Sequence, residues 1–239
     1  MKITATFLIG LLAPIAFAQQ LCDQYAYHSS SGYEFNNNMW GSGSGQGSQC
    51  TNVEWVNSNG CGWRVNWQWA NNRDNVKSYP YSGKQMNPKR LVSQWRDIQS
   101  TAAWSYSGSN IRANVAYDLF THSNPNNPTH SGEYELMIWL GRLGDVWPIG
   151  RQISTVNVAG RQWQLYDGYN GAMRVYSFVA PSQVNNFQAN LKEFFDHLSA
   201  NHGYPANNQY LLTVQFGTEP FTGGPATLSV SNWNANLFT

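Results

Sequence analysis

Charge is scarce in this 239-residue chain, since Asp, Glu, Lys and Arg together make up 11% of it. The 14 basic and 13 acidic residues nearly cancel, which leaves a formal net charge of +1. No basic stripe interleaves with the aromatic residues, and binding a phosphate backbone requires such a concentration of Lys and Arg. We therefore expect no nucleic-acid partner.

Long hydrophobic runs are also missing after the first 18 residues, so we expect no membrane span there. The chain begins with a lysine, an apolar run and the small residues Ala16 and Ala18, a pattern typical of a secretory signal cleaved after Ala18. The alternative is an N-terminal membrane anchor, but the apolar run is shorter than the ~20 residues that span a bilayer. We predict a signal peptide over residues 1–18 and a secreted mature domain over residues 19–239.

Cysteine is limited to Cys22, Cys50 and Cys61. An oxidising destination favours one disulfide and one leftover thiol, and the sequence leaves all three pairings open. No cysteine–histidine spacing resembles a metal site. The G-x-S-x-G elbow of serine hydrolases, the G-x-G-x-x-G fingerprint and the P-loop are all absent. We expect no metal and no cofactor.

Aromatic side chains, in contrast, are abundant: they make up 15% of the chain and include 11 Trp. Asn, Gln, Ser and Gly fill much of the remaining sequence. Such a surface suits a neutral polar ligand with hydrophobic faces, such as a sugar, because aromatic rings stack on C–H groups while amides bond to hydroxyls. The alternative is that the tryptophans fill the core of an all-β domain, and composition does not separate the two.

Strand-like runs recur between Ser-Gly, Asn-Gly, Gly-Gly and Asn-Pro turn signals. The predicted strands are Trp63–Trp69, Asn110–Phe120, Tyr134–Leu140, Gln162–Tyr166, Arg174–Ala180, Tyr210–Phe216 and Ala226–Trp233. One segment has helical spacing instead, with apolar residues from Val184 to Leu198, Asn185 or Asn186 as the N-cap, and Gly203 after its end. The pattern predicts an all-β sandwich or jelly roll of two antiparallel sheets with one external α-helix.

Side-chain alternation places several carboxylates on strand faces that point away from the core. In Tyr134–Leu140 the core face is Leu136, Ile138 and Leu140, and the opposite face is Glu135, Met137 and Trp139. The same test places Asp118 on a non-core face together with Arg112 and Asn114, and it places Glu219 on that of its own strand.

This arrangement of acids suits glycoside hydrolysis, in which one carboxyl group donates a proton to the leaving oxygen and another attacks the anomeric carbon or activates water. A third acid nearby can adjust the protonation of the other two. The alternatives are that these acids lie on solvated faces or bind calcium.

Several longer segments resemble signature segments of glycoside hydrolase family 12. They are Tyr134–Gly141 (YELMIWLG), Gln215–Gly223 (QFGTEPFTG), Asn37–Gly41 (NNMWG), Val76–Tyr79 (VKSY), Ser105–Thr121 (SYSGSNIRANVAYDLFT) and Tyr169–Met173 (YNGAM). The resemblance runs from about Cys22 to Trp233 and is greatest to the fungal endoglucanases of that family. It implies a β-jelly roll whose concave sheet forms an open cleft for a β-glucan chain. It also implies endo-β-1,4-glucanase activity with retention of configuration by double displacement.

The resemblance implies roles for individual residues. Glu135 matches the nucleophile, Glu219 the acid/base, and Asp118 the acid that hydrogen-bonds the nucleophile. Cys22 and Cys50 match the family's N-terminal disulfide. The predicted substrate-binding residues are Asn38, Trp40, Met137, Trp139, Asn170 and Trp147, the last a bulky residue where the family often has a small one before Pro-Ile-Gly.

Three alternatives remain at the level of the sequence. A xyloglucan-specific endo-β-1,4-glucanase would belong to the same family. A non-catalytic, lectin-like glucan-binding module would share the aromatic and amide side chains but would not need facing glutamates. A glutamic peptidase pairs Glu with Gln, and neither glutamate segment matches that pattern. We expect a monomer whose partner is the β-glucan substrate, with no membrane partner.

Overall fold

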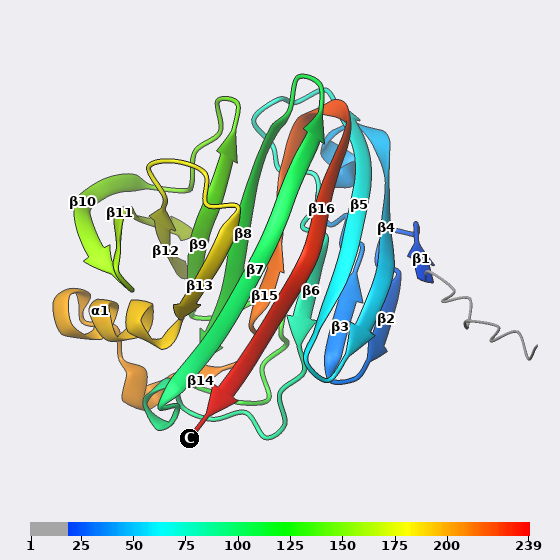
Figure 1. Cartoon of the computed structure of the whole chain (residues 1–239). Coiled ribbons are helices and arrows are strands. Elements are labelled where there is room, and N and C mark those ends of the chain that lie inside the picture. Colours follow the sequence, from blue (N-terminus) through cyan, green and yellow to red (C-terminus); the bar gives the residue numbers. More distant parts are fainter. Residues whose placement is uncertain (1–18) are drawn as a thin grey trace, which may run out of the picture.

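The computed structural model describes residues 19–239, so the signal peptide predicted over residues 1–18 lies outside the described residues. Two sheets form the domain (Figure 1). Sheet A has the strand order β1-β4-β5-β16-β7-β13, and all its pairs are antiparallel. Its strands are β1 (Gln19–Leu21), β4 (Gln46–Asn57), β5 (Gly60–Ala70), β16 (Pro220–Phe238), β7 (Asp97–Gly108) and β13 (Asn186–Asn190).

Sheet B has the order β2-β3-β6-β15-β8-β9-β12-β11-β10, and β14 adds to one end of β8. Its strands are β2 (Tyr27–Ser30), β3 (Tyr33–Asn36), β6 (Tyr81–Lys84), β15 (Gln215–Gly217), β8 (Arg112–His122), β9 (Tyr134–Leu143), β12 (Met173–Val179), β11 (Arg161–Asn170), β10 (Arg151–Val158) and β14 (Tyr210–Leu211). The β9–β12 pair is parallel, which is the one departure from the antiparallel prediction among residues 19–239.

The hydrophobic core lies between the two sheets. Leu136, Ile138 and Leu140 of β9 are buried in it, as their alternation predicts. Bulky residues from both sheets fill the same layer, among them Trp63 and Trp163, which are fully buried. Each fully buried large side chain contributes roughly 1.5–3 kcal/mol relative to leaving it exposed, so this layer dominates the stability of the sandwich. The predicted all-β jelly roll is confirmed.

The helix predicted from Val184 to Leu198 is a strand in its first half and a helix in its second half. Residues Asn186–Asn190 form strand β13, and α1 covers Lys192–His202, next to β10 and β11 in Figure 1. The Oδ1 atom of Asn190 accepts a hydrogen bond from the backbone N–H of Lys192 at 3.1 Å, so the helix start is stabilised four or five residues after the predicted caps, Asn186 and Asn185. Gly203 ends the helix in the left-handed conformation, as predicted.

Short irregular elements complete the chain. The predicted strand Tyr210–Phe216 is interrupted, since Leu212, Thr213 and Val214 separate β14 from β15. Three single turns of 3-10 helix lie at Ser42–Ser44, Val92–Gln94 and Ala206–Asn208. Among residues 19–239, no helix combines the length and the apolar character needed to cross a bilayer.

Candidate active site

Three carboxyl groups lie on the face of sheet B that points away from the core. Asp118 comes from β8 and Glu135 from β9, whose register pairs Asp118 with Met137 and Phe120 with Glu135. Glu219 lies in the short link between β15 and β16, where its backbone pairs with that of Asn114 on β8. Asp118 and Glu135 are only 6% and 8% exposed, which is rare for acids on the outside of a sheet.

Burial raises the pKa of all three acids, and repulsion from neighbouring carboxylates adds to the rise for Asp118 and Glu135. Burial is the largest cause for Asp118, and the charges of Glu135 and Glu219 add to it, so its pKa lies well above the usual value. A protonated Asp118 donates a hydrogen bond to Glu135, which favours the ionised form of Glu135. Burial and the charge of Glu219 nevertheless raise the pKa of Glu135 to about 8. Asp118 and Glu135 therefore interact strongly, and they titrate as a pair.

Glu219 is held by Asn114, a fully buried residue of β8. The Asn114 Nδ2 donates to Glu219 Oε2, and the Asn114 Oδ1 accepts the Glu219 backbone N–H at 2.8 Å. Burial raises the pKa of Glu219 to about 7, and the Asn114 hydrogen bond opposes that rise. The sequence placed Asn114 on the same face as Asp118 but assigned it no role, because the contact joins residues 105 positions apart.

Tyr79 is a second residue that sequence reasoning missed. Its side chain is buried, and its hydroxyl donates to the carbonyl of Ala116 at 3.0 Å. Burial and the charges of Asp118, Glu219 and Glu135 all raise the pKa of this phenol well above its usual value. Tyr79 therefore lies close to all three acids. The only sequence signal was its place in the VKSY segment.

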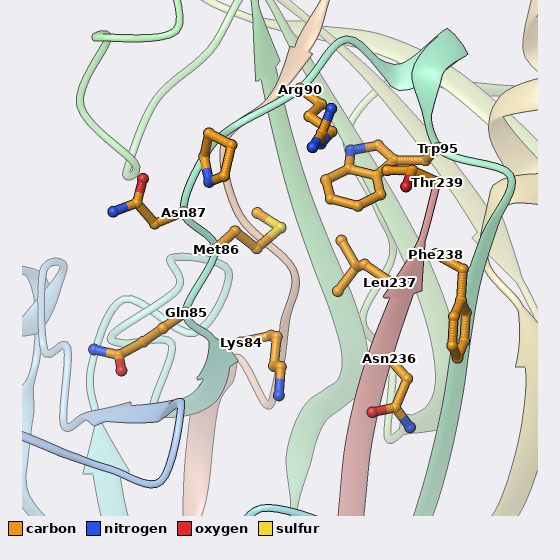
Figure 2. A pocket seen from close by; sticks show the side chains of 11 residues that line it. Lys84, Gln85, Met86, Asn87, Arg90, Trp95, Asn236, Leu237, Phe238 and Thr239 are labelled. Carbon is orange, nitrogen blue, oxygen red and sulfur yellow. The ribbon is translucent and has the colours of Figure 1, made fainter.

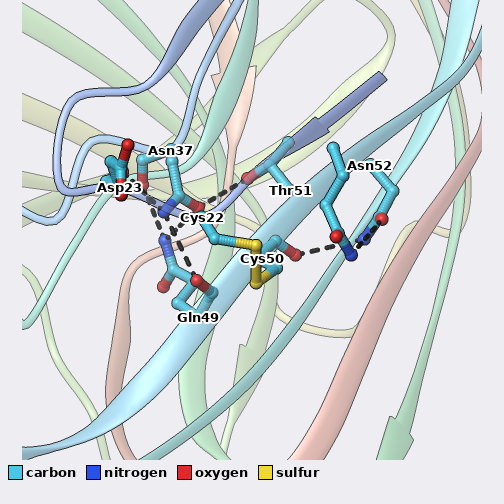
Figure 3. The surroundings of a disulfide bond; sticks show 8 residues. Cys22, Asp23, Asn37, Gln49, Cys50, Thr51 and Asn52 are labelled. Atoms are coloured by element: carbon cyan, nitrogen blue, oxygen red, sulfur yellow. Dashed lines mark hydrogen bonds between the residues drawn. A yellow bond between two sulfur atoms is a disulfide. The ribbon is translucent and has the colours of Figure 1, made fainter. Parts of the chain in front are cut away.

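The loop that carries Asn38 and Trp40 is held in place by a disulfide and by hydrogen bonds of the residue before Asn38. The predicted Cys22–Cys50 disulfide is present, and beside it the buried Asn37 accepts from Thr51 Oγ1 at 2.9 Å and donates to the carbonyl of Asp23 at 3.1 Å (Figure 3). The next residue, Asn38, has φ 40° and donates to the carbonyl of Tyr79 at 3.0 Å.

Trp40 lies two residues further along this loop and is 53% exposed, so a large part of its indole ring is free to contact a ligand. The remaining free thiol, Cys61, is buried.

Met137 and Trp139 lie on the same face as Glu135, within a second apolar cluster on the outer side of sheet B. The Trp139 indole N–H donates to the Met137 sulfur at 3.4 Å, and Trp139 is only 2% exposed. Other members of this cluster, including Val146 and Tyr166, therefore cover its ring. Trp139 packs beneath the surface next to Glu135 and supports it.

Trp147 follows β9 in the loop before β10 and is 49% exposed. The Arg142 guanidinium lies 3.6 Å from the centroid of its ring, and its indole N–H donates to Asp145 Oδ1 at 3.2 Å. Arg142 pairs with Asn114 across β8 and β9, so Trp147 is linked through one residue to the Glu219 anchor. Asn170 is exposed at the end of β11.

A cavity of about 450 Å³ lies elsewhere, between the segment after β6 and the end of β16 (Figure 2). Lys84, Met86, Arg90 and Trp95 line it, and none of the three acids does. Within residues 19–239, no group of three or more His, Cys, Asp or Glu side chains is arranged to hold a metal ion. The candidate site is therefore the acidic face of sheet B, not the cavity.

Comparisons with known proteins identify the family of this chain. Residues 31–237 match Glycosyl hydrolase family 12. Endoglucanase A of Aspergillus kawachii is 46% identical over 99% of this chain and 100% of its own length. Xyloglucan-specific endo-beta-1,4-glucanase A of Emericella nidulans is 42% identical, again over 99% of this chain and 100% of its own length.

Among solved structures, Trichoderma harzianum endoglucanase 3 from family GH12 superposes with a TM-score of 0.91 and 51% identity, over 94% of this chain and all of that one. The catalytic domain of Humicola grisea Cel12A in complex with a thio cellotetraose gives a TM-score of 0.90 and 48% identity, over 92% and 99% of the two chains. The protein belongs to glycosyl hydrolase family 12.

Proposed function

We propose that the protein is a secreted endo-β-1,4-glucanase that cuts internal bonds of cellulose and related β-glucans. The observation that carries this proposal is the cluster of Asp118, Glu135 and Glu219 on one sheet face, where burial raises all three pKa values and repulsion between carboxylates adds to the rise for Asp118 and Glu135. Perturbed acids of this kind are typical of the proton transfers in glycoside hydrolysis. Both relatives described above carry endoglucanase names.

The reaction proceeds in two steps with retention of configuration. In the first, the Glu135 carboxylate attacks the anomeric carbon while the protonated Glu219 gives its proton to the leaving glycosidic oxygen. In the second, Glu219 accepts a proton from water, the resulting hydroxide attacks the same carbon, and Glu135 leaves as a carboxylate. Asp118 stays protonated and donates to Glu135, which stabilises the charge that Glu135 regains when it leaves.

The raised pKa of Glu219 fits its role in the first step. A carboxyl group with a pKa near 7 keeps its proton in mildly acidic solution, where an ordinary glutamate is ionised. Glu135 must lose its proton for attack, although burial and the charge of Glu219 raise its pKa to about 8. While Glu219 holds its proton that repulsion is absent, and the hydrogen bond from Asp118 favours the ionised form of Glu135. Activity is therefore highest in acidic solution, and it falls as the proton is lost from Glu219.

Substrate binding extends along the outer face of sheet B. Trp40 and Trp147 offer exposed rings for stacking on glucose units, while Asn38 and Asn170 supply amides to hydroxyl groups. Met137 lies beside the nucleophile, Glu135. Trp139 supports Met137 through the hydrogen bond from its indole N–H to the Met137 sulfur. Xyloglucan is the second candidate substrate, because a relative of 42% identity is named xyloglucan-specific. A panel of carboxymethylcellulose, mixed-linkage glucan and xyloglucan ranks these substrates by kcat/KM.

Two substitutions test the catalytic assignment. Glu135→Gln and Glu219→Gln each keep the size of the side chain but remove a nucleophile or a proton donor, so each should lower reducing-sugar release at least about 1,000-fold. Glu54→Gln is the matched control, because Glu54 forms a surface ion pair with Arg64 on sheet A. Substantial hydrolysis by either of the first two variants, in a folded protein, would contradict the proposal.

Secretion and the monomeric state have separate tests. N-terminal sequencing of protein from the culture medium should give Gln19 as the first residue. Light scattering on the purified protein should give the mass of a single mature chain.

Retention of configuration has its own test. Proton NMR of a fresh digest should show a β-anomer as the first product, whereas an α-anomer would contradict retention.

A further inference from the structure

Strand β16 passes from one sheet to the other directly after Glu219. Its first residues pair with β8 in sheet B, Pro220 opposite Ala113. From Gly223 onward it pairs with β5 in sheet A, and from Ala226 also with β7. The backbone of Glu219 is therefore held at a crossing point between the sheets, and its position depends on contacts from both of them.

A line of hydrogen bonds connects sheet A to the Glu219 anchor through this crossing. The Trp67 indole N–H of β5 donates to the Tyr106 hydroxyl of β7 at 2.6 Å. The Tyr106 hydroxyl lies 3.2 Å from Thr218 Oγ1, and the Thr218 hydroxyl donates to the backbone carbonyl of Asn114. The line thus ends on the residue that binds Glu219.

Every proton in this line has a fixed direction. Trp67 has only a donor, and the backbone carbonyl of Asn114 is only an acceptor. The Thr218 hydroxyl gives its proton to that carbonyl, so the Tyr106 hydroxyl must donate to Thr218 while it accepts from Trp67. Burial raises the pKa of Tyr106 well above its usual value, which keeps the donating proton in place across the working pH range.

The side chain of Asn114 is equally constrained. Its Oδ1 accepts the backbone N–H of Glu219, so the amide cannot turn over without placing two N–H groups against each other. Its Nδ2 must then face the Glu219 carboxylate. The backbone N–H of Asn114 also donates to the Glu219 carbonyl at 3.2 Å, so three bonds fix the two residues together.

We propose that Asn114, Thr218, Tyr106 and Trp67 form a positioning relay that holds Glu219 in the orientation needed for proton transfer and ties that orientation to sheet A. The inference rests on the proposed role of Glu219 as acid/base. Asn114 positions the carboxyl group directly, and the other three residues act through Asn114. A proton donor must lie within hydrogen-bond reach of the leaving oxygen, so loss of this constraint reduces turnover more than it reduces binding.

The relay also affects the pH at which Glu219 loses its proton. A hydrogen bond donated to a carboxylate stabilises the ionised form, and its removal raises the pKa of the acid. Loss of the Asn114 donor therefore moves the basic limb of the kcat/KM profile to higher pH. Hydrogen bonds to charged groups are strong enough for a movement of about one pH unit.

The experiment measures pH profiles of kcat and kcat/KM on carboxymethylcellulose for four variants. Asn114→Ala should lower kcat at least about tenfold, leave KM within about twofold and move the basic limb up by about one pH unit. Tyr106→Phe and Thr218→Val should move the limb in the same direction by a smaller amount. Thr218→Ser keeps the hydroxyl and should restore the wild-type profile.

Tyr117→Phe is the matched control. Tyr117 is a buried tyrosine of β8 whose hydroxyl bonds to Ser100 of sheet A at 2.8 Å, so it also loses one bond between the sheets. Because that bond does not lead to Asn114, Tyr117→Phe should lower stability as much as Tyr106→Phe but leave the basic limb unchanged. If Asn114→Ala does not fold, the comparison of Tyr106→Phe with Tyr117→Phe decides the question.

Two outcomes separate the relay from the proposed function. Suppose that Asn114→Ala and Tyr106→Phe both keep the basic limb of the wild-type kcat/KM profile while Glu219→Gln is inactive. That result would overturn the relay and leave the proposed function in place. Full hydrolysis by Glu219→Gln would overturn the proposed function itself. A limb that moves equally in Tyr106→Phe and Tyr117→Phe would assign both residues a merely structural role and also refute the relay.

Discussion

The buried acids predict that the protein becomes less stable as the pH rises through neutrality, which is opposite to ordinary acid denaturation. Burial raises the pKa of Glu219 from 4.5 to about 7 in the folded protein. Between these two values the unfolded chain has released this proton while the folded chain still holds it. The folded state binds more protons, so the free energy of unfolding falls as pH increases. Glu135 and Asp118 are raised in the same direction.

The size of this effect follows from the change in pKa. A rise from 4.5 to about 7 corresponds to about 3 kcal/mol, and the partial exposure of Glu219 reduces this to about 2–3 kcal/mol. That contribution is fully present below about pH 4.5 and is lost by about pH 8. Glu219→Gln carries no titratable group, so its free energy of unfolding should decrease less over this range, by about 2–3 kcal/mol.

Urea unfolding followed by tryptophan fluorescence, repeated at intervals from about pH 4 to pH 8.5, measures the difference. Glu54→Gln serves as the control, because that acid lies in an exposed ion pair with Arg64 and should leave the pH dependence of the wild type intact. Parallel curves for wild type and Glu219→Gln would refute the reasoning, since they would mean that Glu219 titrates alike in the folded and unfolded states.

Three further outcomes follow from the structure. Replacing both Cys22 and Cys50 by Ser should lower the free energy of unfolding by about 3–4 kcal/mol in urea titrations, since the bond closes a loop with a sequence separation of 28. Phe194→Ala should cost about 3–5 kcal/mol in the same assay, because its fully buried ring packs against Trp163 and Phe178. Trp147→Ala should raise KM for long glucan chains several-fold with little change in kcat, and an unchanged KM would show that this ring does not bind substrate.

Strand alternation was enough to place the main features of sheet B. Leu136 and Ile138 are in the core, and Glu135 and Met137 are on the other face, as period-two patterning requires. The prediction succeeded because β9 is a central strand with one face fully buried in the core. A shift of one residue in its register would expose that face, so only one register is possible. The resemblance to a known family supplied the disulfide and the assignment of roles, which patterning alone left open.

The errors have physical causes as well. Phe187 and Ala189 are buried by the alternation of β13, but Phe187 also fits helical spacing together with Leu191 and Phe194, so the pattern did not show where the strand ends and the helix begins. The Asn114 anchor was missed for a different reason. Its role depends on the pairing of β8 with the link before β16, and such long-range register is not visible in local sequence.

Strand β16 occupies the centre of sheet A, between β5 and β7, and within residues 19–239 it is the only strand that also pairs in sheet B. Without β16, sheet A lacks its middle strand, and the backbone of Glu219 is no longer held between β8 and sheet A. The centre of the sandwich and the acidic face of sheet B therefore depend on the same segment, so we expect a chain truncated before β16 to lose the stable fold and the acidic cluster together.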